Sequence, residues 1–201
     1  MSEKESRWRY QKLNQYTARF LLAKRRKGMN IKGIVYIALF SVLTAAGAFV
    51  IVPVPYSPVP ITLQTLFCIL SGAILGRYKG MASQVVYLLL GFAGLPVFSR
   101  GGSGIGFLFG PTGGYLIGFV AAAYMCGWLE EKGKILPGLI LGTIIIYLPG
   151  VVQLKLVTGL QWTKTMFIGL VPFLPGDILK VIVGLGIYNT LKKTGFIEYF
   201  K

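Results

Sequence analysis

The chain has 201 residues, of which 54% are hydrophobic and only 13% are charged, and 21 basic against six acidic residues give a net charge of +15. Soluble domains carry about 25% charged residues, so this composition excludes a soluble enzyme domain, a disordered chain and a disulfide scaffold. It indicates an integral membrane protein. A basic excess can also indicate nucleic-acid binding, but the charges cluster in one tail and between apolar runs, which argues against that class.

The first predicted segment is a basic tail at residues 1–28. It holds nine of the 21 basic residues and two acids. A secretory signal is not expected, because no small-residue cleavage site follows a short apolar core. We expect a cytoplasmic tail, either solvated or lying as a short surface helix against anionic lipid. Met29 is an alternative start, in which case residues 1–28 are an extension of a membrane domain at 29–201.

Six apolar runs follow the tail, and a membrane-spanning helix needs about 20 residues. Backbone groups in lipid must be paired within a helix or a closed barrel, and barrel strands would alternate in polarity. The pattern therefore predicts an all-α integral membrane protein, a compact bundle of six transmembrane helices, in which the second run is short unless its flanks join it. The predicted spans are 31–52, 61–75, 81–98, 112–129, 135–156 and 172–191.

The charges between the runs predict the orientation of the bundle. Lys and Arg concentrate in the tail, the second and fourth links and the C-terminus, which an even number of spans places on one side. The positive-inside rule makes this side cytoplasmic, so we expect both termini inside a prokaryotic cytoplasmic membrane. Beyond the tail, the residues concerned are Arg77, Lys79, Lys132, Lys134, Lys192, Lys193 and Lys201.

Two links without this basic excess are expected on the outer face. The link at 53–60 has four prolines in eight residues, which favour an extended and stiff backbone. The link at 99–114 is dense in glycine. Lys155 and Lys164 are expected to anchor the chain at the outer interface.

Several kinds of chemistry are missing from the sequence. There is no histidine to shuttle protons near neutral pH and no G-x-x-x-x-G-K-[ST] phosphate loop to hydrolyse ATP. No paired carboxylates or metal-ligand spacing appear, and Cys68 and Cys126 lie in separate apolar runs, where small packing residues are expected. We therefore predict no catalytic site, metal or cofactor.

Asp177 is the strongest candidate for a functional residue. It is the chain's only aspartate, and Lys180 lies three residues further along the same apolar run, where positions i and i+3 share a helix face. Ionisable groups inside a membrane helix usually face the bundle interior and serve a function. Two interpretations stay open: a structural ion pair, or the polar wall of a ligand pocket.

Other polar residues are weaker candidates for ligand contacts. Arg100, alone in its glycine-rich link, is either a solvated cation or a cation at the mouth of a pocket that meets an anionic ligand. Gln84 and Tyr87 share a face at i and i+3 within the third run, with hydrogen bonding between helices as the alternative for Gln84. The same alternatives hold for Gln64.

Small residues follow one another at three- and four-residue steps along the first run. Ala38, Ser41 and Ala45 belong to this set, and small faces let helices approach closely in lipid. The face either packs inside the bundle or forms a groove that docks another membrane subunit.

Together these features resemble the BioY family, the biotin-specific substrate-binding subunits (S components) of energy-coupling factor (ECF) transporters. The resemblance covers most of residues 29–193, and its most specific stretches are G-P-T-G-G and L-P-G-D-x-x-K. The matching residues are 58–66, 87–91, 94–98, 110–115 and 173–180.

The resemblance implies a six-helix fold that binds biotin from the outside, beneath its outer links, and works with a membrane coupling subunit and two ATPases, although some members are reported to act alone. It maps the family's Asp and Lys directly onto Asp177 and Lys180, while Gln84 and Arg100 are the nearest candidates for polar contacts in helix three and the following loop. The family's docking face has alanines at four-residue spacing. This chain departs from that pattern, because Ala38-Val42-Ala46 has Val at its middle step. A membrane-embedded enzyme and a structural membrane subunit are the alternative functions.

Overall fold

The computed structural model describes residues 31–200, so the predicted tail at 1–28 lies outside the described residues. The chain divides into two compact units after Ile34, and the helix bundle lies in the second. The elements are α2 (Ile31–Gly47), β1 (Ile51–Val52), β2 (Ile61–Thr62), α3 (Gln64–Leu75), α4 (Arg77–Phe92), η1 (Ser99–Gly101), α5 (Ile105–Leu108), α6 (Gly113–Glu131), α7 (Ile135–Thr158), α8 (Trp162–Gly169), η2 (Val171–Phe173), α9 (Leu174–Lys193) and α10 (Phe196–Phe200).

Each of the six predicted spans contains one helix: α2, α3, α4, α6, α7 and α9. The stretches 135–158 and 162–193 are long and apolar enough to cross a membrane, whereas α2 and α3 are shorter apolar helices of 17 and 12 residues. These features, with many large apolar side chains exposed along α7 and α9, are those of a helical membrane protein.

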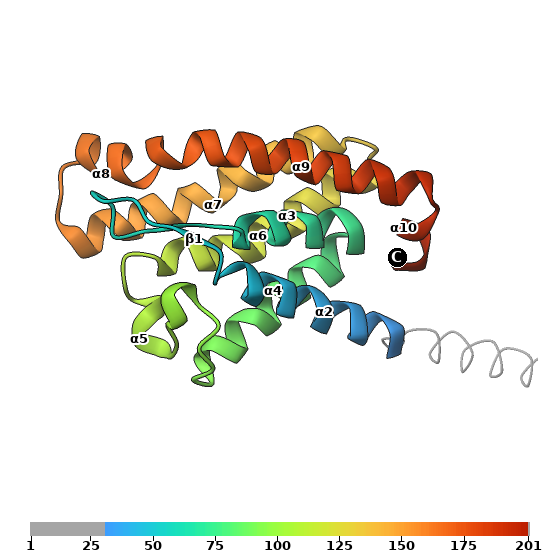
Figure 1. Cartoon of the computed structure of the whole chain (residues 1–201), viewed down its shortest axis with the longest axis horizontal. Coiled ribbons are helices and arrows are strands. Elements are labelled where there is room, and N and C mark those ends of the chain that lie inside the picture. The colour runs from blue at the N-terminus through green and yellow to red at the C-terminus, as the bar shows by residue number, and fades with distance from the viewer. Residues whose placement is uncertain (1–30, 201) are drawn as a thin grey trace, which may run out of the picture. The chain divides into compact units, whose positions relative to one another are not determined.

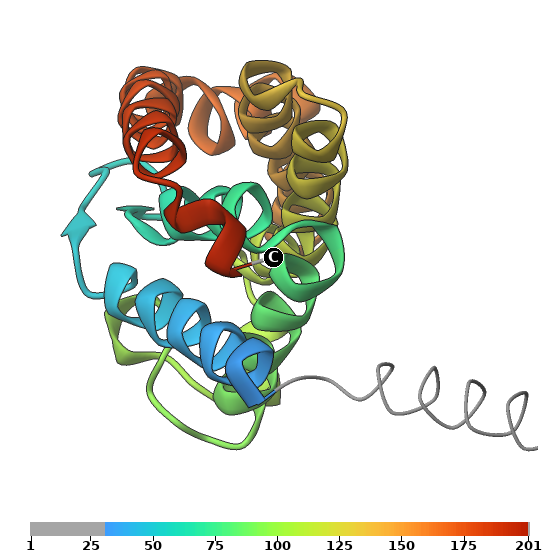
Figure 2. The same cartoon turned by 90° about the vertical axis from the view of Figure 1, so that its right-hand side faces the viewer.

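Helix α6 forms the centre of the bundle. It packs against α3, α4 and α7, while α9 packs against α3 and α7. Five core residues of α6 have exposed fractions of 4% or less, so this helix is surrounded by protein along its inner faces. They are Leu116, Phe119, Ala122, Ala123 and Cys126. Figure 2 looks nearly along the helix axes of this arrangement.

Two glycines allow helices to meet where a side chain would not fit. Gly76 alone separates α3 from α4 and has a φ of +79°, a conformation that glycine adopts without strain. A Cβ on Gly114 would collide with the carbonyl of Pro149, so this glycine lets α6 begin directly against α7. The second predicted link is therefore a single residue, and Arg77 and Lys79 belong to α4 instead.

The outer links predicted from the sequence contain local structure that the apolar pattern did not reveal. Ile51 and Val52 pair antiparallel with Thr62 and Ile61, so the proline-rich link closes as a hairpin. The glycine-dense link includes η1 and α5, and α8 precedes α9. Figure 1 shows the hairpin, α5 and α8 at one end of the described bundle, with α10 at the other.

Candidate functional site

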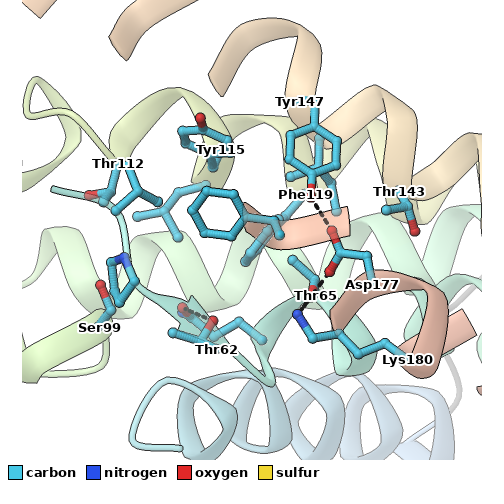
Figure 3. Close-up of a pocket in the computed structure, with 16 residues that line it drawn as sticks. Thr62, Thr65, Ser99, Thr112, Tyr115, Phe119, Thr143, Tyr147, Asp177 and Lys180 are labelled. Atoms are coloured by element: carbon cyan, nitrogen blue, oxygen red, sulfur yellow. Dashed lines mark hydrogen bonds and ion pairs between the residues drawn. The ribbon is translucent and has the colours of Figure 1, made fainter. Parts of the chain in front are cut away.

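A narrow cavity of about 50 Å³ lies between α3, α6, α7 and α9, beneath the hairpin and η1 (Figure 3). Both polar groups and aromatic or aliphatic groups line it. The lining residues are Val59, Pro60, Thr62, Gln64, Thr65, Ser99, Thr112, Tyr115, Leu116, Phe119, Thr143, Ile146, Tyr147, Phe173, Asp177 and Lys180.

The polar part of the cavity lining is built around an ion pair on the first turns of α9. Lys180 Nζ lies 2.9 Å from Asp177 Oδ1, and the two side chains are only 9% and 8% exposed. Pro175 near the start of α9 has the φ that a first helical turn requires, and an acid there is stabilised by the helix dipole. The three-residue spacing then brings the ammonium onto the same face.

Two neighbouring helices complete this group, which we call the site cluster (Thr65, Tyr147, Asp177 and Lys180). Tyr147 of α7 donates its hydroxyl proton to Asp177 Oδ2. Lys180 Nζ donates to Thr65 Oγ1 of α3 at 2.8 Å. Figure 3 shows the four side chains converging from α3, α7 and α9.

The site cluster retains hydrogen-bonding capacity for a ligand. An ammonium has three donors and a carboxylate about four acceptor positions. Lys180 uses two donors within the protein, and Asp177 accepts one bond at each oxygen from Lys180 and Tyr147. The cavity can therefore offer both a charged donor and a charged acceptor to the same ligand.

Aromatic rings form the wall beside the site cluster. The ring centroids of Tyr115, Tyr147 and Phe173 lie 6.2 to 6.5 Å from one another. The Tyr115 hydroxyl donates to the Gly169 carbonyl oxygen at 2.8 Å, which fixes this ring between α6 and α8. Such walls take up the apolar part of a ligand while a few polar groups orient it.

Sequence reasoning missed Tyr147, although a spacing signal was present. Thr143 and Tyr147 are polar residues at i and i+4 in an apolar run, so they share one helix face. Both line the cavity. The signal was weak because a hydroxyl-bearing residue at this spacing is compatible with the membrane-facing surface as well.

Tyr87, predicted as a ligand contact, does not line the cavity and supports a residue that does. Its side chain is fully buried. Its hydroxyl accepts from Gln64 Nε2 and donates to the Val97 carbonyl oxygen at 3.2 Å. Gln64 Oε1 in turn accepts from Thr62 Oγ1 at 3.0 Å. The structure thus places Gln64 at the cavity and Tyr87 behind it.

Gln84 is also absent from the cavity lining and belongs to a second polar group. Its Nε2 lies 3.1 to 3.2 Å from Thr44 Oγ1, Ser71 Oγ and Ser83 Oγ, and these three oxygens share its two N–H donors. Ser41 Oγ joins this group through the Ser83 carbonyl oxygen at 2.6 Å. We call these five residues of α2, α3 and α4 the interhelical cluster. Gln84 therefore makes hydrogen bonds between helices, which was the alternative to a ligand contact.

Arg100 lies in η1 and is exposed, and it does not line the cavity. Its φ is +60°, an uncommon conformation for a residue other than glycine. The preceding residue, Ser99, is buried and does line the cavity. The structure therefore places the Arg100 backbone at the cavity's edge.

The predicted docking residues divide between two faces of α2. Ala38 is exposed, whereas Ser41 is completely buried and Ala45 is 9% exposed. Ser41 and Ala45 therefore do not belong to the open face of this helix, because they pack within the bundle. The exposed small or β-branched residues of this helix include Ala38, Val42 and Ala46.

The described residues 31–200 contain no group of three or more His, Cys, Asp and Glu side chains arranged to hold a metal ion. Within that part of the chain, the charged cavity-lining residues are Asp177 and Lys180.

Comparisons with known proteins agree on one family. A family model described as the BioY family matches residues 21–195. A probable biotin transporter BioY of Pyrococcus horikoshii is 38% identical over 164 residues, which cover 82% of this chain and 98% of the relative. A biotin transporter BioY of Thermotoga maritima is 39% identical over 159 residues, which cover 77% of this chain and 92% of the relative.

A solved structure is similar over nearly its whole length. The crystal structure of the S-component for biotin from an ECF-type ABC transporter matches with a TM-score of 0.78 and 29% sequence identity. The match covers 87% of this chain and 98% of that chain.

Proposed function

The chain belongs to the BioY family, and we propose that it binds biotin as the substrate-specific subunit (S component) of an ECF transporter. The family's named members are transporter components and not enzymes. The observation that carries the proposal is the buried Asp177–Lys180 pair, which borders a cavity that aromatic rings also line.

Biotin matches the polar and apolar lining of this cavity. Its ureido ring has two N–H donors and one carbonyl, its thioether ring is apolar, and its valerate arm ends in a carboxylate. We assign a ureido N–H to Asp177 and the ureido carbonyl to Lys180. The apolar ring then lies against the wall that contains Tyr115 and Phe173.

The valerate carboxylate is assigned to the opposite end of the cavity. Figure 3 shows Ser99 and Thr112 there, away from Asp177 and Lys180. Arg100 follows Ser99 directly, so a small movement of η1 brings a guanidinium to a carboxylate at this edge. In this proposal neither Gln84 nor Tyr87 touches biotin. Gln84 packs between helices, and Tyr87 acts through its hydrogen bond with Gln64.

The cavity must widen to admit the vitamin. Its volume of about 50 Å³ accommodates a few water molecules, whereas ligand sites are about 300–1,000 Å³. Val59 and Pro60 of the hairpin and Ser99 of η1 form the part of the lining contributed by links. We propose that these links open for entry and close over biotin, which excludes water and strengthens the polar contacts.

In the membrane we propose six spans with both termini in the cytoplasm of a prokaryotic cell. Helices α2, α3 with its flanks, α4, α6, α7 and α9 supply the spans of a membrane domain at 29–201, preceded by a cytoplasmic tail at 1–28. The basic links support this orientation through the positive-inside rule. The cavity then opens toward the outside.

The energy source is proposed to be separate from this chain, since the sequence has no phosphate-binding loop. We propose a membrane coupling subunit and two ATPase subunits as partners. The open face of α2, with Ala38, Val42 and Ala46, is the proposed surface for the coupling subunit, because small residues permit close helix approach.

The experiment is to purify the chain in detergent, identify its co-purifying small molecules by mass spectrometry, and titrate the emptied protein with biotin in the absence of ATP. We expect biotin in the preparation and saturable binding without nucleotide. Failure to bind biotin, or ATP hydrolysis by the pure chain, would contradict the proposed function.

The orientation has its own test in intact cells. In a background without Cys68 and Cys126, a cysteine at the exposed position of Tyr56 should react with an impermeant reagent, and one at Lys134 should not. External labelling at position 134 would reverse the proposed topology.

A further inference from the structure

A second cavity runs between α7, α8 and α9. Its volume is about 550 Å³. It is bordered by three apolar stripes with four-residue spacing: Ile140 to Val152 on α7, Trp162 to Leu170 along α8 and its C-cap, and Leu174 to Ile182 on α9. Leu148 in the first stripe is 64% exposed, so the groove opens at the surface of these membrane helices.

The length of the groove matches the hydrocarbon layer of one leaflet. From Ile140 to Val152 it extends about 18 Å, close to the roughly 15 Å of that layer. An acyl chain can therefore lie along the whole groove.

One end of the groove has an aromatic ring and a cation. Trp162 borders the groove and is 51% exposed, and Lys155 Nζ lies 5.5 Å from the centre of its ring. Lys155 donates to the Leu160 carbonyl oxygen at 2.8 Å, which leaves two of its three donors. Within residues 31–200, no acid forms an ion pair with Lys155.

This arrangement matches the parts of a phospholipid in order. Tryptophan and lysine mark the headgroup level of a membrane protein, and the apolar stripes begin directly beside them. The positive charge of Lys155 complements a phosphate, and an anionic headgroup gains most from it.

We propose that the groove between α7, α8 and α9 binds one anionic phospholipid, with its phosphate at Lys155 and one acyl chain along the three stripes. Thr143, Tyr147 and Asp177 border both the groove and the biotin cavity. The acyl chain therefore covers the membrane side of the wall that holds the site cluster. The proposal depends on the membrane placement of α7 to α9 and not on which ligand fills the other cavity.

Fluorescence quenching of Trp162 in lipid vesicles tests this site. The chain has three tryptophans, so the double variant Trp8→Phe/Trp128→Phe leaves Trp162 as the sole emitter. It is reconstituted in phosphatidylcholine with increasing brominated phosphatidylglycerol, and then in the converse mixture. We expect phosphatidylglycerol to bind beside Trp162 about fivefold more tightly than phosphatidylcholine, and Lys155→Gln to remove that preference.

Two matched controls separate a lipid site from general contact with the bilayer. Lys164→Gln removes the same charge from α8, but position 164 lies about 200° around the helix from Trp162, so the preference should remain. Ile144→Phe fills the groove and should abolish the preference. Leu141→Phe, at a similarly exposed α7 position outside the lining, should preserve it.

Three results would overturn the proposal. Equal quenching by both lipids in the parent would show that only bulk lipid covers the groove. An equal loss of preference in Lys155→Gln and Lys164→Gln would indicate a diffuse surface charge. Absence of quenching by either lipid would show that protein, such as a second copy of the chain, covers Trp162.

Discussion

The site cluster and the interhelical cluster are both buried polar groups on membrane helices, and they differ in what lies beside them. Asp177 and Lys180 border a cavity and keep hydrogen-bonding capacity. Gln84 lies among hydroxyl groups of α2, α3 and α4, and it borders neither of the two cavities described here. Burial of a polar residue in such a helix therefore does not by itself identify a ligand contact.

The two clusters also differ in the helices that they join. The interhelical cluster connects α2, α3 and α4 through neutral hydrogen bonds, which are worth about 0.6 kcal/mol each on average in membranes. The site cluster contains a buried ion pair, whose desolvation is costly and often leaves little net gain in stability. We infer that the first cluster mainly stabilises the fold and the second mainly serves binding.

The largest expected effect on binding comes from Asp177→Asn. This change removes the charged acceptor and leaves Lys180 without its acidic partner. Hydrogen bonds to charged groups contribute about 1.5–3 kcal/mol, so biotin affinity should fall roughly 10- to 100-fold or more. Titration calorimetry measures the loss, and gel filtration in detergent should show that the folded fraction changes less than binding does.

Lys180→Gln should weaken binding next most strongly, by about tenfold, because a charge-assisted bond of about 1.5 kcal/mol is lost. Lys164→Gln is the matched control on the exposed surface of α8. Its dissociation constant should equal that of the parent. Similar losses in both variants would attribute the effect to net charge instead of to the site cluster.

Tyr147→Phe should have a smaller effect on biotin affinity, and it tests how much the groups around Asp177 contribute to binding. The change keeps the ring and removes the hydroxyl that donates to Asp177. Loss of one such bond, at about 1 kcal/mol, should reduce biotin affinity about fivefold. Calorimetry of Tyr115→Phe provides the comparison, because that hydroxyl binds the Gly169 carbonyl oxygen and not Asp177; an equal loss there would contradict a specific role for Tyr147.

Gln84→Leu should have the smallest effect on binding and a measurable effect on stability. It removes the two amide N–H donors that bind the hydroxyl oxygens of the interhelical cluster, a loss of about 1 kcal/mol. The loss is limited because Thr44, Ser71 and Ser83 each still donate to a backbone carbonyl. Calorimetry should give a biotin affinity within about twofold of the parent, and a tenfold loss would place Gln84 in the ligand site.

The helices were predictable because long apolar runs mark segments removed from water, whether lipid or protein covers them. Each apolar run contains a helix, and the i, i+3 spacing of Asp177 and Lys180 anticipated their ion pair. The hairpin and α8 were not anticipated. Two-residue strands have too little sequence pattern, and α8 continues the apolar character that leads into α9.

The cavity lining was harder to predict than the helices. Gln84 and Gln64 are both glutamines in apolar runs, and only Gln64 borders the cavity. The distinction depends on which helices pack around each residue, and a single sequence does not contain that information. Ser41 and Ala45 illustrate the same point, since their spacing defines a face without telling whether protein or lipid covers it.

The most direct test is thermal unfolding of the parent, Asp177→Asn and Gln84→Leu in detergent, each with and without saturating biotin. A ligand that binds only the folded state raises the melting temperature according to its affinity. We expect Gln84→Leu to start lower than the parent yet rise as much with biotin, and Asp177→Asn, whatever its starting temperature, to rise far less at the same biotin concentration. The reverse pattern, a full rise in Asp177→Asn and a lost rise in Gln84→Leu, would contradict the assignment of binding to the site cluster.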